Sequence, residues 1–444
     1  MKFLPLVAAT FFMVSGGPYG IEDILGGAGY AWAIAILLLL PLIWSLPTAL
    51  MIGELASAIP AEGGFYVWVR RALGPFWGYQ EGWLSLSASI FDMAIYPSIF
   101  ALYLGQLFPV LSNGWQGYLC KVSVVVVCCL WNLGGAPAVG EGSIGLSALL
   151  LSPFAIFVLL GFWHGFTTHP TVQWGQSSSP AMLTTAMLVA MWNYMGWDNA
   201  STVAQEVENP QRNYPRAIVA AAAITAFTYV LPLAATAFAG LSVDSFSTGD
   251  WMAAAQAIGG RWLGLAIVAG GAICGVGMFN ALMMSYTRLP MAMAEDGMLP
   301  KVLTKRNSRD VPWVSVILCG AAWALALQLP FERLISIDLI LYGTSLLLEF
   351  VALIVLRIRE PELERPFKAG NLFFACSLCV GPFVLICYAL WVSRGETLGH
   401  TATGIGSVSS LLFASGVGLL GTLLYWVTAY PLAKRKLAAA SATD

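Results

Sequence analysis

A glycine-proline interruption with two acidic residues lies inside the first hydrophobic segment of this chain. The stretch reads SGGPYGIED over residues 15–23 and ends in Glu22 and Asp23. Glycine and proline weaken a continuous helix, and a charge at the centre of a bilayer costs at least about 2.5 kcal/mol. Unwound backbone is tolerated inside a membrane only where it is buried in protein or lines a cavity. We therefore expect a discontinuous helix whose gap faces a polar ligand.

The composition requires a membrane environment. The chain of 444 residues is 58% hydrophobic and only 10% charged, a balance that a soluble domain of this length does not have. Runs of roughly 20 apolar residues, long enough to cross a bilayer, predict an all-α integral membrane protein with twelve transmembrane helices. The expected spans are 4–25, 31–58, 76–108, 115–133, 143–164, 182–205, 215–240, 262–289, 312–330, 334–356, 372–393 and 404–430.

The basic residues predict how the chain is oriented. All but four of the 21 Lys and Arg residues fall in the loops and termini on one side, and the exceptions are Lys121, Arg261, Arg333 and Arg394. This bias places both termini in the cytoplasm of a protein of the cell (inner or plasma) membrane. Met1–Gly17 also has some features of a signal peptide, but it lacks an A-x-A cleavage site. Glu54 and Glu62 are expected to pair with loop residues such as Arg70 or Arg71.

Metal and enzyme chemistry find little support in the sequence. Cys376 and Cys379 have metal-like spacing, but no further Cys or His follows nearby, so we interpret the eight cysteines as small buried hydrophobes. The chain lacks a Walker motif and any hydrolase constellation. We expect no enzyme activity, no metal or other cofactor, and no nucleic acid partner.

A second interruption follows the first after five spans. It reads MWNYMGWDN over residues 191–199. Because five is an odd number, the two halves must lie upside down relative to each other, and paired broken helices in inverted repeats mark the central site of a secondary transporter. The expected division is 1–165 for the first repeat (spans 1–5), 166–357 for the second (spans 6–10), and 358–444 for two peripheral spans and a cytoplasmic C-terminus.

Several ordered motifs together resemble a known family. They are SGGPYGIED (15–23), GELASAIP (53–60), EGG (62–64), ALGPFWG (72–78), Asp92 with Tyr96 and Pro97, WNYMGWD (192–198), EVENPQR (206–212), EDGMLP (295–300), and Glu349 leading to RPF (365–367). In these motifs the chain resembles the amino acid–polyamine–organocation superfamily, and within it the polyamine-uptake branch known from plants, which is LAT-like. The resemblance implies a LeuT-like fold of two inverted five-helix repeats, with discontinuous spans 1 and 6 and two peripheral spans.

The first interruption departs from the pattern of amino acid transporters in this superfamily. Those proteins resemble one another in a Gly-(Ser/Ala)-Gly turn whose amides hold the substrate carboxylate, whereas this chain has Gly20-Ile21-Glu22 there. Repulsion from Glu22 would disfavour a substrate carboxylate in a partly desolvated site, so a ligand with amines and no acid is expected. Alternatively, Glu22 and Asp23 cap the second half-helix.

Two more acids are expected near the same centre. Asp92 lies midway along the third span with Tyr96 one turn later, and Asp198 follows the second interruption, where relatives often carry a Glu implicated in protonation. Unpaired acids in a dry interior either take protons or bind cations. A buried protonated acid at Asp92 and helix capping by Asp198 are the structural alternatives.

Aromatic residues supply the second feature of an amine site. Trp192 and Tyr194 flank the second interruption, and an aromatic face stabilises an ammonium group by about 0.5–2 kcal/mol. The predicted substrate-binding residues are Gly16, Gly17, Gly20, Glu22, Asp92, Tyr96, Trp192, Asn193, Tyr194 and Asp198. Glu22, Asp92 and Asp198 are the predicted coupling residues.

The expected function is secondary transport of organic amines, polyamines such as putrescine and spermidine, by proton-coupled import. Proton-coupled relatives often carry a Lys in the fifth span, but residues 143–164 have none, so a sodium site at Ser147 or Ser152 stays open beside protonation of the acids. The alternatives are an amino acid permease or exchanger of the same superfamily and a non-transporting amine sensor. In each case the partners are a small cationic amine or amino acid and the lipid bilayer.

Overall fold

Every extended regular element of the described chain is a helix. The computed structural model describes residues 1–112, 114–172, 174, 179–202, 207–242, 246–329, 331–394 and 409–434. In the first half, the α-helices are α1 (Phe3–Val14), α2 (Glu22–Ile43), α3 (Ser45–Ala58), α4 (Phe65–Leu73), α5 (Pro75–Gly105), α6 (Gly114–Asn132), α7 (Ala136–Thr168) and α8 (Pro180–Asn193). The second half holds α9 (Pro210–Phe238), α10 (Trp251–Gly259), α11 (Arg261–Tyr286), α12 (Arg288–Glu295), α13 (Trp313–Ala326), α14 (Phe331–Arg359), α15 (Leu372–Leu378), α16 (Val380–Ser393) and α17 (Ser410–Leu424). Short 3-10 turns are η1 (Pro109–Leu111), η2 (Trp197–Thr202) and η4 (Lys301–Thr304), and η5 (Tyr425–Ala429) is a π-helical turn.

Nine helical stretches in the described residues are long and apolar enough to cross a membrane, where the sequence predicts twelve. One of them runs from Glu22 to Ala58 and combines parts of two predicted spans, because α2 and α3 follow each other directly. Gly29 divides α2 with a positive φ of 67°, at the predicted loop between those spans. The apolar helices α1 and α13 are shorter than a full span. The all-helical membrane class is therefore confirmed, with nine spans by length and composition.

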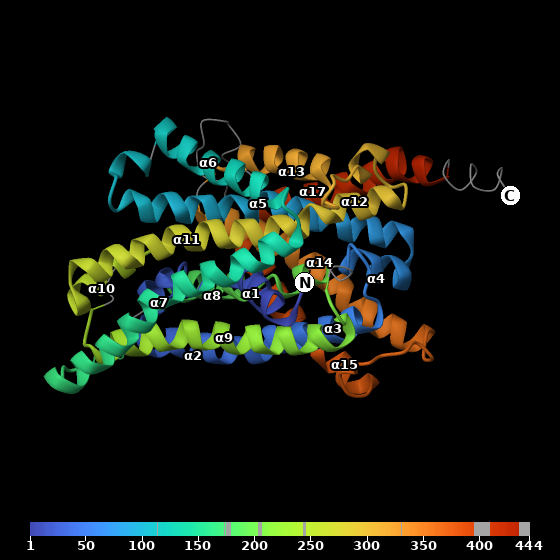
Figure 1. Ribbon diagram of the computed structural model, residues 1–444. Coiled ribbons are helices and arrows are strands. Elements are labelled where there is room, and N and C mark those ends of the chain that lie inside the picture. Colours follow the sequence, from blue (N-terminus) through green and yellow to red (C-terminus); the bar gives the residue numbers. More distant parts are fainter. Residues whose placement is uncertain are drawn as a thin grey trace.

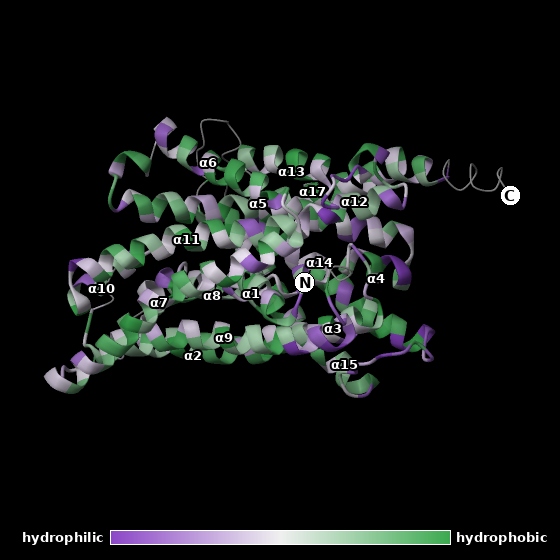
Figure 2. Ribbon diagram, in the orientation of Figure 1, coloured by the Kyte–Doolittle hydropathy of each residue, from purple (hydrophilic) through white to green (hydrophobic). Residues whose placement is uncertain are grey.

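The long helices lie along a common axis, parallel or antiparallel to one another, and form a bundle with two distinct ends. Figure 1 shows α10 at the left end, and α4, α12 and α15 toward the right end. We call these the α10 end and the α4/α12 end. Figure 2 shows hydrophilic segments at the α4/α12 end, while the long helices are mostly hydrophobic. Among the nine stretches, α5 is the most buried, at 83%, and lies in the interior, whereas the stretch Ser410–Lys434, which contains α17, is the least buried, at 17%, and is peripheral.

Both predicted interruptions are present. α1 ends at Val14 and α2 begins at Glu22, with Gly17 and Gly20 in between at φ values of 73° and 88°. α8 ends at Asn193, and the chain resumes as η2 after Gly196, whose φ is 88°. These left-handed conformations favour glycine, which explains the glycines in both stretches.

Side chains replace the helical hydrogen bonds that are lost at the interruptions. The indole N–H of Trp44 donates to the carbonyl of Tyr194 at 3.1 Å, and the hydroxyl of Tyr229 donates to the carbonyl of Asn193 at 2.7 Å. The side-chain amide of Asn193 donates to the carbonyl of Gly20 at 3.1 Å, which joins the two interruptions. Backbone away from water needs such partners, so unwound segments are sustainable here.

A buried ion-pair cluster joins α3 to the end of α14. Glu54 is fully buried and pairs with Arg357 and with Arg365, whose Nε lies 3.2 Å from Glu54 Oε1. The expected pairing of Glu54 with Arg70 or Arg71 is therefore wrong. Arg71 pairs with Glu360 and Arg70 with Asp296, because the α14 terminus and not α4 reaches Glu54.

We predict that Glu54→Gln destabilises the fold far more than the matched change Glu360→Gln. The first leaves the guanidinium groups of Arg357 and Arg365, only 4% and 7% exposed, without their counter-charge, which costs about 3–5 kcal/mol. The second breaks a pair with side chains 43% and 32% exposed, worth about 0–1 kcal/mol. Thermal unfolding of the purified variants in detergent measures both, and equal melting temperatures would contradict the expectation.

Candidate substrate-binding site

A small cavity lies at the centre of the bundle, between the two interruptions. Its volume is about 20 Å³, room for about one water molecule. The lining comes from α1 and the first interruption, α5, α8 and the second interruption, α11 and α14. The lining residues are Met13, Val14, Tyr19, Asp92, Tyr96, Trp192, Asn193, Met195, Gly196, Asn199, Met278, Tyr286, Asp338 and Tyr342.

Asp92 is held in this cavity by three aromatic donors. The hydroxyl of Tyr96 donates to Asp92 Oδ1 at 2.5 Å, and the hydroxyl of Tyr286 approaches Oδ2 at 3.3 Å. The indole N–H of Trp192 reaches Oδ1 at 3.4 Å, and its ring stacks on Tyr96 with centroids 6.2 Å apart. These contacts orient one carboxyl and two aromatic faces around the same small volume.

Two further carboxyl groups lie beside the cavity. Asp338 on α14 is a lining residue and is 1% exposed. Asp198 on η2 is 3% exposed and accepts a short hydrogen bond from the hydroxyl of Tyr342, a lining residue that in turn accepts from the N–H of Gly196 at 3.1 Å. Asp198 thus lies behind Tyr342, outside the lining itself.

Glu22 lies outside the cavity and is fully hydrogen bonded. Its Oε2 accepts from the N–H of Gly20 at 2.6 Å, and its Oε1 accepts from the N–H of Gly249 at 3.0 Å and from the hydroxyl of Tyr103. The carboxyl therefore covers the free amide of the first interruption. Asp23 points elsewhere, accepting from Thr248 at 2.8 Å.

Of the remaining predicted binding residues, some line the central cavity and others only support the backbone around it. Asn193 lines the cavity, whereas Tyr194 donates to the carbonyl of Leu37 at 2.8 Å and lies outside it. Gly20 faces the ring of Trp192. Gly16 packs against the sulfur atoms of Cys274 and Met278 so closely that any side chain there would overlap them, and Gly17 meets Leu150. These three glycines position the interruption and are not among the lining residues.

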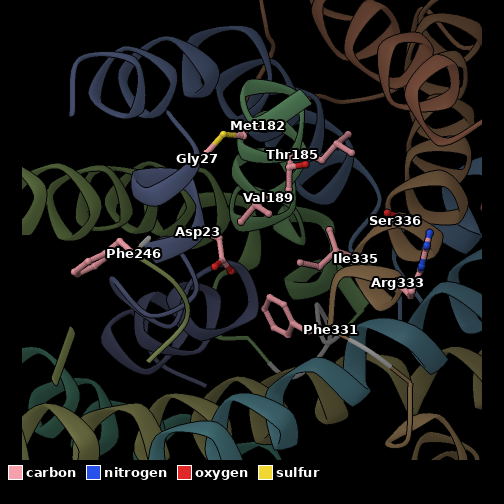
Figure 3. Close-up of a pocket in the computed structure, with 11 residues that line it drawn as sticks. Asp23, Gly27, Met182, Thr185, Val189, Phe246, Phe331, Arg333, Ile335 and Ser336 are labelled. Carbon is pink, nitrogen blue, oxygen red and sulfur yellow. The ribbon is translucent and has the colours of Figure 1, made fainter. Parts of the chain in front are cut away.

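A larger pocket, of about 380 Å³, lies toward the α10 end. Figure 3 shows Asp23 and Phe246 on one side of it and Arg333 and Ser336 on the other. Phe331 lines this pocket and makes an edge contact with Trp192, with ring centroids 6.0 Å apart. Trp192 also lines the central cavity, so the two rings form the partition between the pocket and the cavity.

The opposite end is held closed by ion pairs. Arg306 pairs with Glu62 and with Glu295, each at 2.9 Å, and Arg70 pairs with Asp296 at 2.5 Å. The backbone N–H of Gly63, in the loop before α4, donates to the carbonyl of Thr202 on η2 at 3.2 Å. The structure therefore has a pocket at the α10 end and a sealed α4/α12 end.

The chemistry of the lining favours a cation. Asp92 and Asp338 supply acidic oxygen atoms, the aromatic rings supply faces for an ammonium group, and none of the lining residues is a Lys or Arg. Sequence reasoning missed Asp338, Tyr286 and Tyr342. For Asp338 the signal was present, since it is an acid within the apolar run 334–356, the same criterion that identified Asp92.

Comparisons with known proteins find transporters of amino acids and of polyamines. The family model described as "Amino acid permease" matches residues 7–405. The chain is similar to the "Polyamine transporter RMV1" of Arabidopsis thaliana, 34% identical over 86% of this chain and 78% of that protein. It is also similar to the "Polyamine transporter PUT1" of Oryza sativa subsp. japonica, 34% identical over 92% of this chain and 76% of that protein. The "Serine/threonine exchanger SteT" of Bacillus subtilis (strain 168) is 26% identical over 97% of this chain and 94% of its own length.

We predict that Trp192→Ala opens the central cavity to reagents from the α10 end. Met13, Met195 and Met278 line the cavity and are at most 6% exposed, so peroxide oxidises them slowly while Trp192 covers them. Their sulfoxide formation, followed by mass spectrometry, should be several-fold faster in the variant. The matched control is Trp163→Ala on α7, where the ring is 68% exposed and borders neither space. Unchanged oxidation rates in Trp192→Ala would show that this ring is not the partition.

Proposed function

Because the chain belongs to the amino acid permease family, we propose that it is a secondary transporter that imports organic amines, polyamines such as putrescine and spermidine, together with protons. The observation that carries the proposal is the central cavity, with acids and aromatic rings in its lining and no basic residue. An ammonium group there would meet carboxylates and ring faces, whereas a substrate carboxylate would meet like charge. The polyamine transporters among the similar proteins support the same substrate class.

The position of Glu22 supports an amine over an amino acid. In the resemblance described above, bare amides of the first interruption hold a substrate carboxylate. Here the N–H of Gly20 is already bonded to Glu22 Oε2 at 2.6 Å, within a buried set of three donors. A substrate carboxylate would have to displace this internal one, so Glu22 acts on specificity by filling the anion position and not by touching the amine.

The arrangement of helices supports alternating access. We interpret residues 3–28 as span 1 and residues 30–58 as span 2. Helix α8 together with η2 then forms the broken span 6. On this interpretation the chain has twelve spans, which contain a LeuT-like inverted repeat. The repeats would cover 1–165 and 166–357, with 358–444 peripheral. On the predicted orientation, the pocket at the α10 end faces outward and the sealed α4/α12 end faces the cytoplasm. We interpret this as an outward-facing conformation in which Trp192 and Phe331 close the substrate cavity.

Proton coupling is supported by the donor atoms near the first interruption. The side chains that face the Cα atoms of Gly16 and Gly17 are those of Cys274, Met278, Leu150 and Leu151, which offer sulfur and carbon and no oxygen ligand for a sodium ion. Of the two serines named for a sodium site, Ser152 on α7 donates to its own helix at Leu149 and is exposed. The hydroxyl of Ser147 is buried without a hydrogen bond within the described residues, so it keeps the sodium alternative open. The buried acids of the bundle are the groups that we propose take the coupled ion, as protons.

A second candidate is exchange of small neutral amino acids. It is favoured by the similarity to the serine/threonine exchanger over nearly the whole chain. The two functions differ in whether the substrate carries a carboxylate, and uptake competition separates them.

We predict that purified protein in sodium-free liposomes accumulates spermidine when the outside is acidic. With the membrane potential clamped and one proton per amine, each pH unit corresponds to 1.36 kcal/mol and supports about tenfold accumulation. Putrescine should compete, whereas leucine and serine should not. Accumulation that requires sodium and ignores the pH gradient would overturn proton coupling, and competition by serine alone would favour the exchanger.

We predict that Glu22→Gly shifts specificity toward amino acids. The change removes the internal carboxylate and frees the N–H groups of Gly20 and Gly249 for a substrate carboxylate. A charge-assisted contact of this kind is worth roughly 1.5–3 kcal/mol, so leucine binding should improve about tenfold to a hundredfold while spermidine transport falls.

Thermal-shift titrations with leucine and with spermidine measure this change in specificity. The control is Glu22→Gln, which keeps the side-chain volume. Glu22→Gln removes the charge but still covers the amides, so it should bind leucine less well than Glu22→Gly. An unaltered preference in both variants would mean that Glu22 only supports the second half-helix.

A further inference from the structure

Two glutamates lie deeper in the bundle than the cavity and have no part in the site described above. Glu81 on α5 and Glu349 on α14 are both 0% exposed. Neither belongs to the lining of the central cavity. A carboxyl group sealed in a membrane bundle is costly and needs a reason.

The two glutamates continue the acidic faces of the cavity along two packed helices. On α5, Glu81 and Asp92 are eleven residues apart, which is three helical turns and returns to the same face. On α14, Asp338 and Glu349 have the same separation and also share a face. α5 and α14 pack against each other. Glu81 lies near the start of α5, which follows α4, and Glu349 lies in the half of α14 that leads to the same end, so both glutamates lie between the cavity and the α4/α12 end. Each glutamate therefore lies about 16 Å along its helix from the acid of the cavity.

The carboxyl of Glu349 lacks any partner that would stabilise a charge. Both of its oxygen atoms are buried without a hydrogen bond from the described residues, as is Oε2 of Glu81. Glu81 Oε1 accepts only from the hydroxyl of Ser85, at 3.2 Å. An ionised carboxylate in this state would carry the full desolvation cost, so Glu349 must be neutralised by a bound cation or by a proton.

The groups around Glu349 do not supply that neutralisation. The titratable groups that interact with it are Asp198 on η2, Glu81 on α5 and Tyr342 on its own helix. Basic residues on the neighbouring elements are engaged elsewhere: Arg357 and Arg365 with Glu54 of α3, Arg70 of α4 with Asp296, and Arg71 of α4 with Glu360. Within the described residues there is also no group of three ligands that could hold a metal ion.

We propose that Glu349 is the binding site of the coupled proton, separate from the amine cavity. The proposal rests on the proposed function and deepens it, because import of an amine with a proton requires both to be bound at once. If the same carboxylates took the amine and the proton, the two would compete and the protein would exchange one for the other. A proton on Glu349, beyond the cavity acids, leaves the carboxyl groups of Asp92 and Asp338 for the amine, whose charge neutralises them when it is bound.

Asp198 links the two sites. It interacts with Glu349 and Glu81, and its hydrogen bond to Tyr342 places it against the cavity lining. Asp198 belongs to the interrupted span, whereas Glu81 and Glu349 lie on continuous helices. Movement of η2 relative to α5 and α14 changes the distance from Asp198 to Glu349, and with it the energy of a charge on Glu349. Proton release can in this way depend on the conformation of the interrupted span.

The test combines a spectroscopic and a transport measurement on the full chain in liposomes. Infrared spectra at neutral pH should show a C=O component of a protonated carboxyl that is lost in the difference between wild type and Glu349→Gln and is retained in Glu141→Gln, an exposed glutamate on α7. With a pH gradient and clamped potential, spermidine accumulation should fall from about tenfold per pH unit to about onefold in Glu349→Gln, while spermidine binding stays within about twofold of wild type.

Each outcome decides one statement. Spectra in which folded Glu349→Gln loses no protonated-carboxyl component, or pH-driven accumulation that is unaltered in it, overturn the assignment to Glu349. Thermal stabilisation of wild type by sodium that Glu349→Gln loses would show a metal cation in place of the proton, and also overturns it. Wild type that fails to bind or accumulate spermidine contradicts the proposed function, whereas the band still tests the proton on Glu349.

A second measurement requires no substitution. Dicyclohexylcarbodiimide reacts with protonated carboxyl groups in apolar surroundings. Mass spectrometry of labelled wild-type protein at neutral pH should find the adduct on Glu349 and not on Glu141. Absence of the Glu349 adduct at both neutral and acidic pH would contradict the proposal.

Discussion

Burial of carboxyl groups without basic partners is the constraint on which the rest of this structure depends. Asp92, Asp198, Asp338, Glu81 and Glu349 all lie in the interior of an apolar bundle and are at most 6% exposed. The arginines near the α4/α12 end neutralise Glu54 and Glu62 instead. Such a charge balance is stable only with protons or a cationic ligand bound, and the proposed function supplies both.

The two interruptions show how the backbone accommodates this interior. Their glycines adopt left-handed conformations, and buried side chains such as Trp44, Tyr229 and Asn193 bond the carbonyl groups that helices would otherwise pair. Glu22 does the same for the amide of Gly20. In an amino acid transporter of the resembling family, that amide would receive the substrate. Here the chain supplies its own carboxylate to that amide, and in the proposed function this difference favours an amine over an amino acid.

Sequence reasoning predicted the features that depend on local chemistry. Glycine and proline located the first interruption, and the glycine and polar residues of 193–199 located the second. Acids with neighbouring aromatics within apolar runs predicted that Asp92, Tyr96, Trp192 and Asn193 lie at one site, and they line one cavity. It could not predict the direction in which Glu22 points, because its partners Tyr103 and Gly249 are distant in sequence. The pairing of Glu54 with Arg357 was missed for the same reason. Asp338 and Glu81 were overlooked within long apolar runs, and Glu349 was noted only as part of a motif. Their spacing marks shared faces, because Glu81 lies eleven residues before Asp92 and Asp338 eleven residues before Glu349.

The most direct test of this account compares two ligands of equal length that differ at one end. Putrescine carries an amine at each end of a four-carbon chain, whereas 4-aminobutyrate carries one amine and one carboxylate. Equilibrium binding to the purified protein in sodium-free buffer, by isothermal titration, isolates the effect of the carboxylate. The account predicts binding of putrescine and at least about tenfold weaker binding of 4-aminobutyrate, since repulsion in a partly desolvated site exceeds about 1.4 kcal/mol. Equal or tighter binding of 4-aminobutyrate would contradict it.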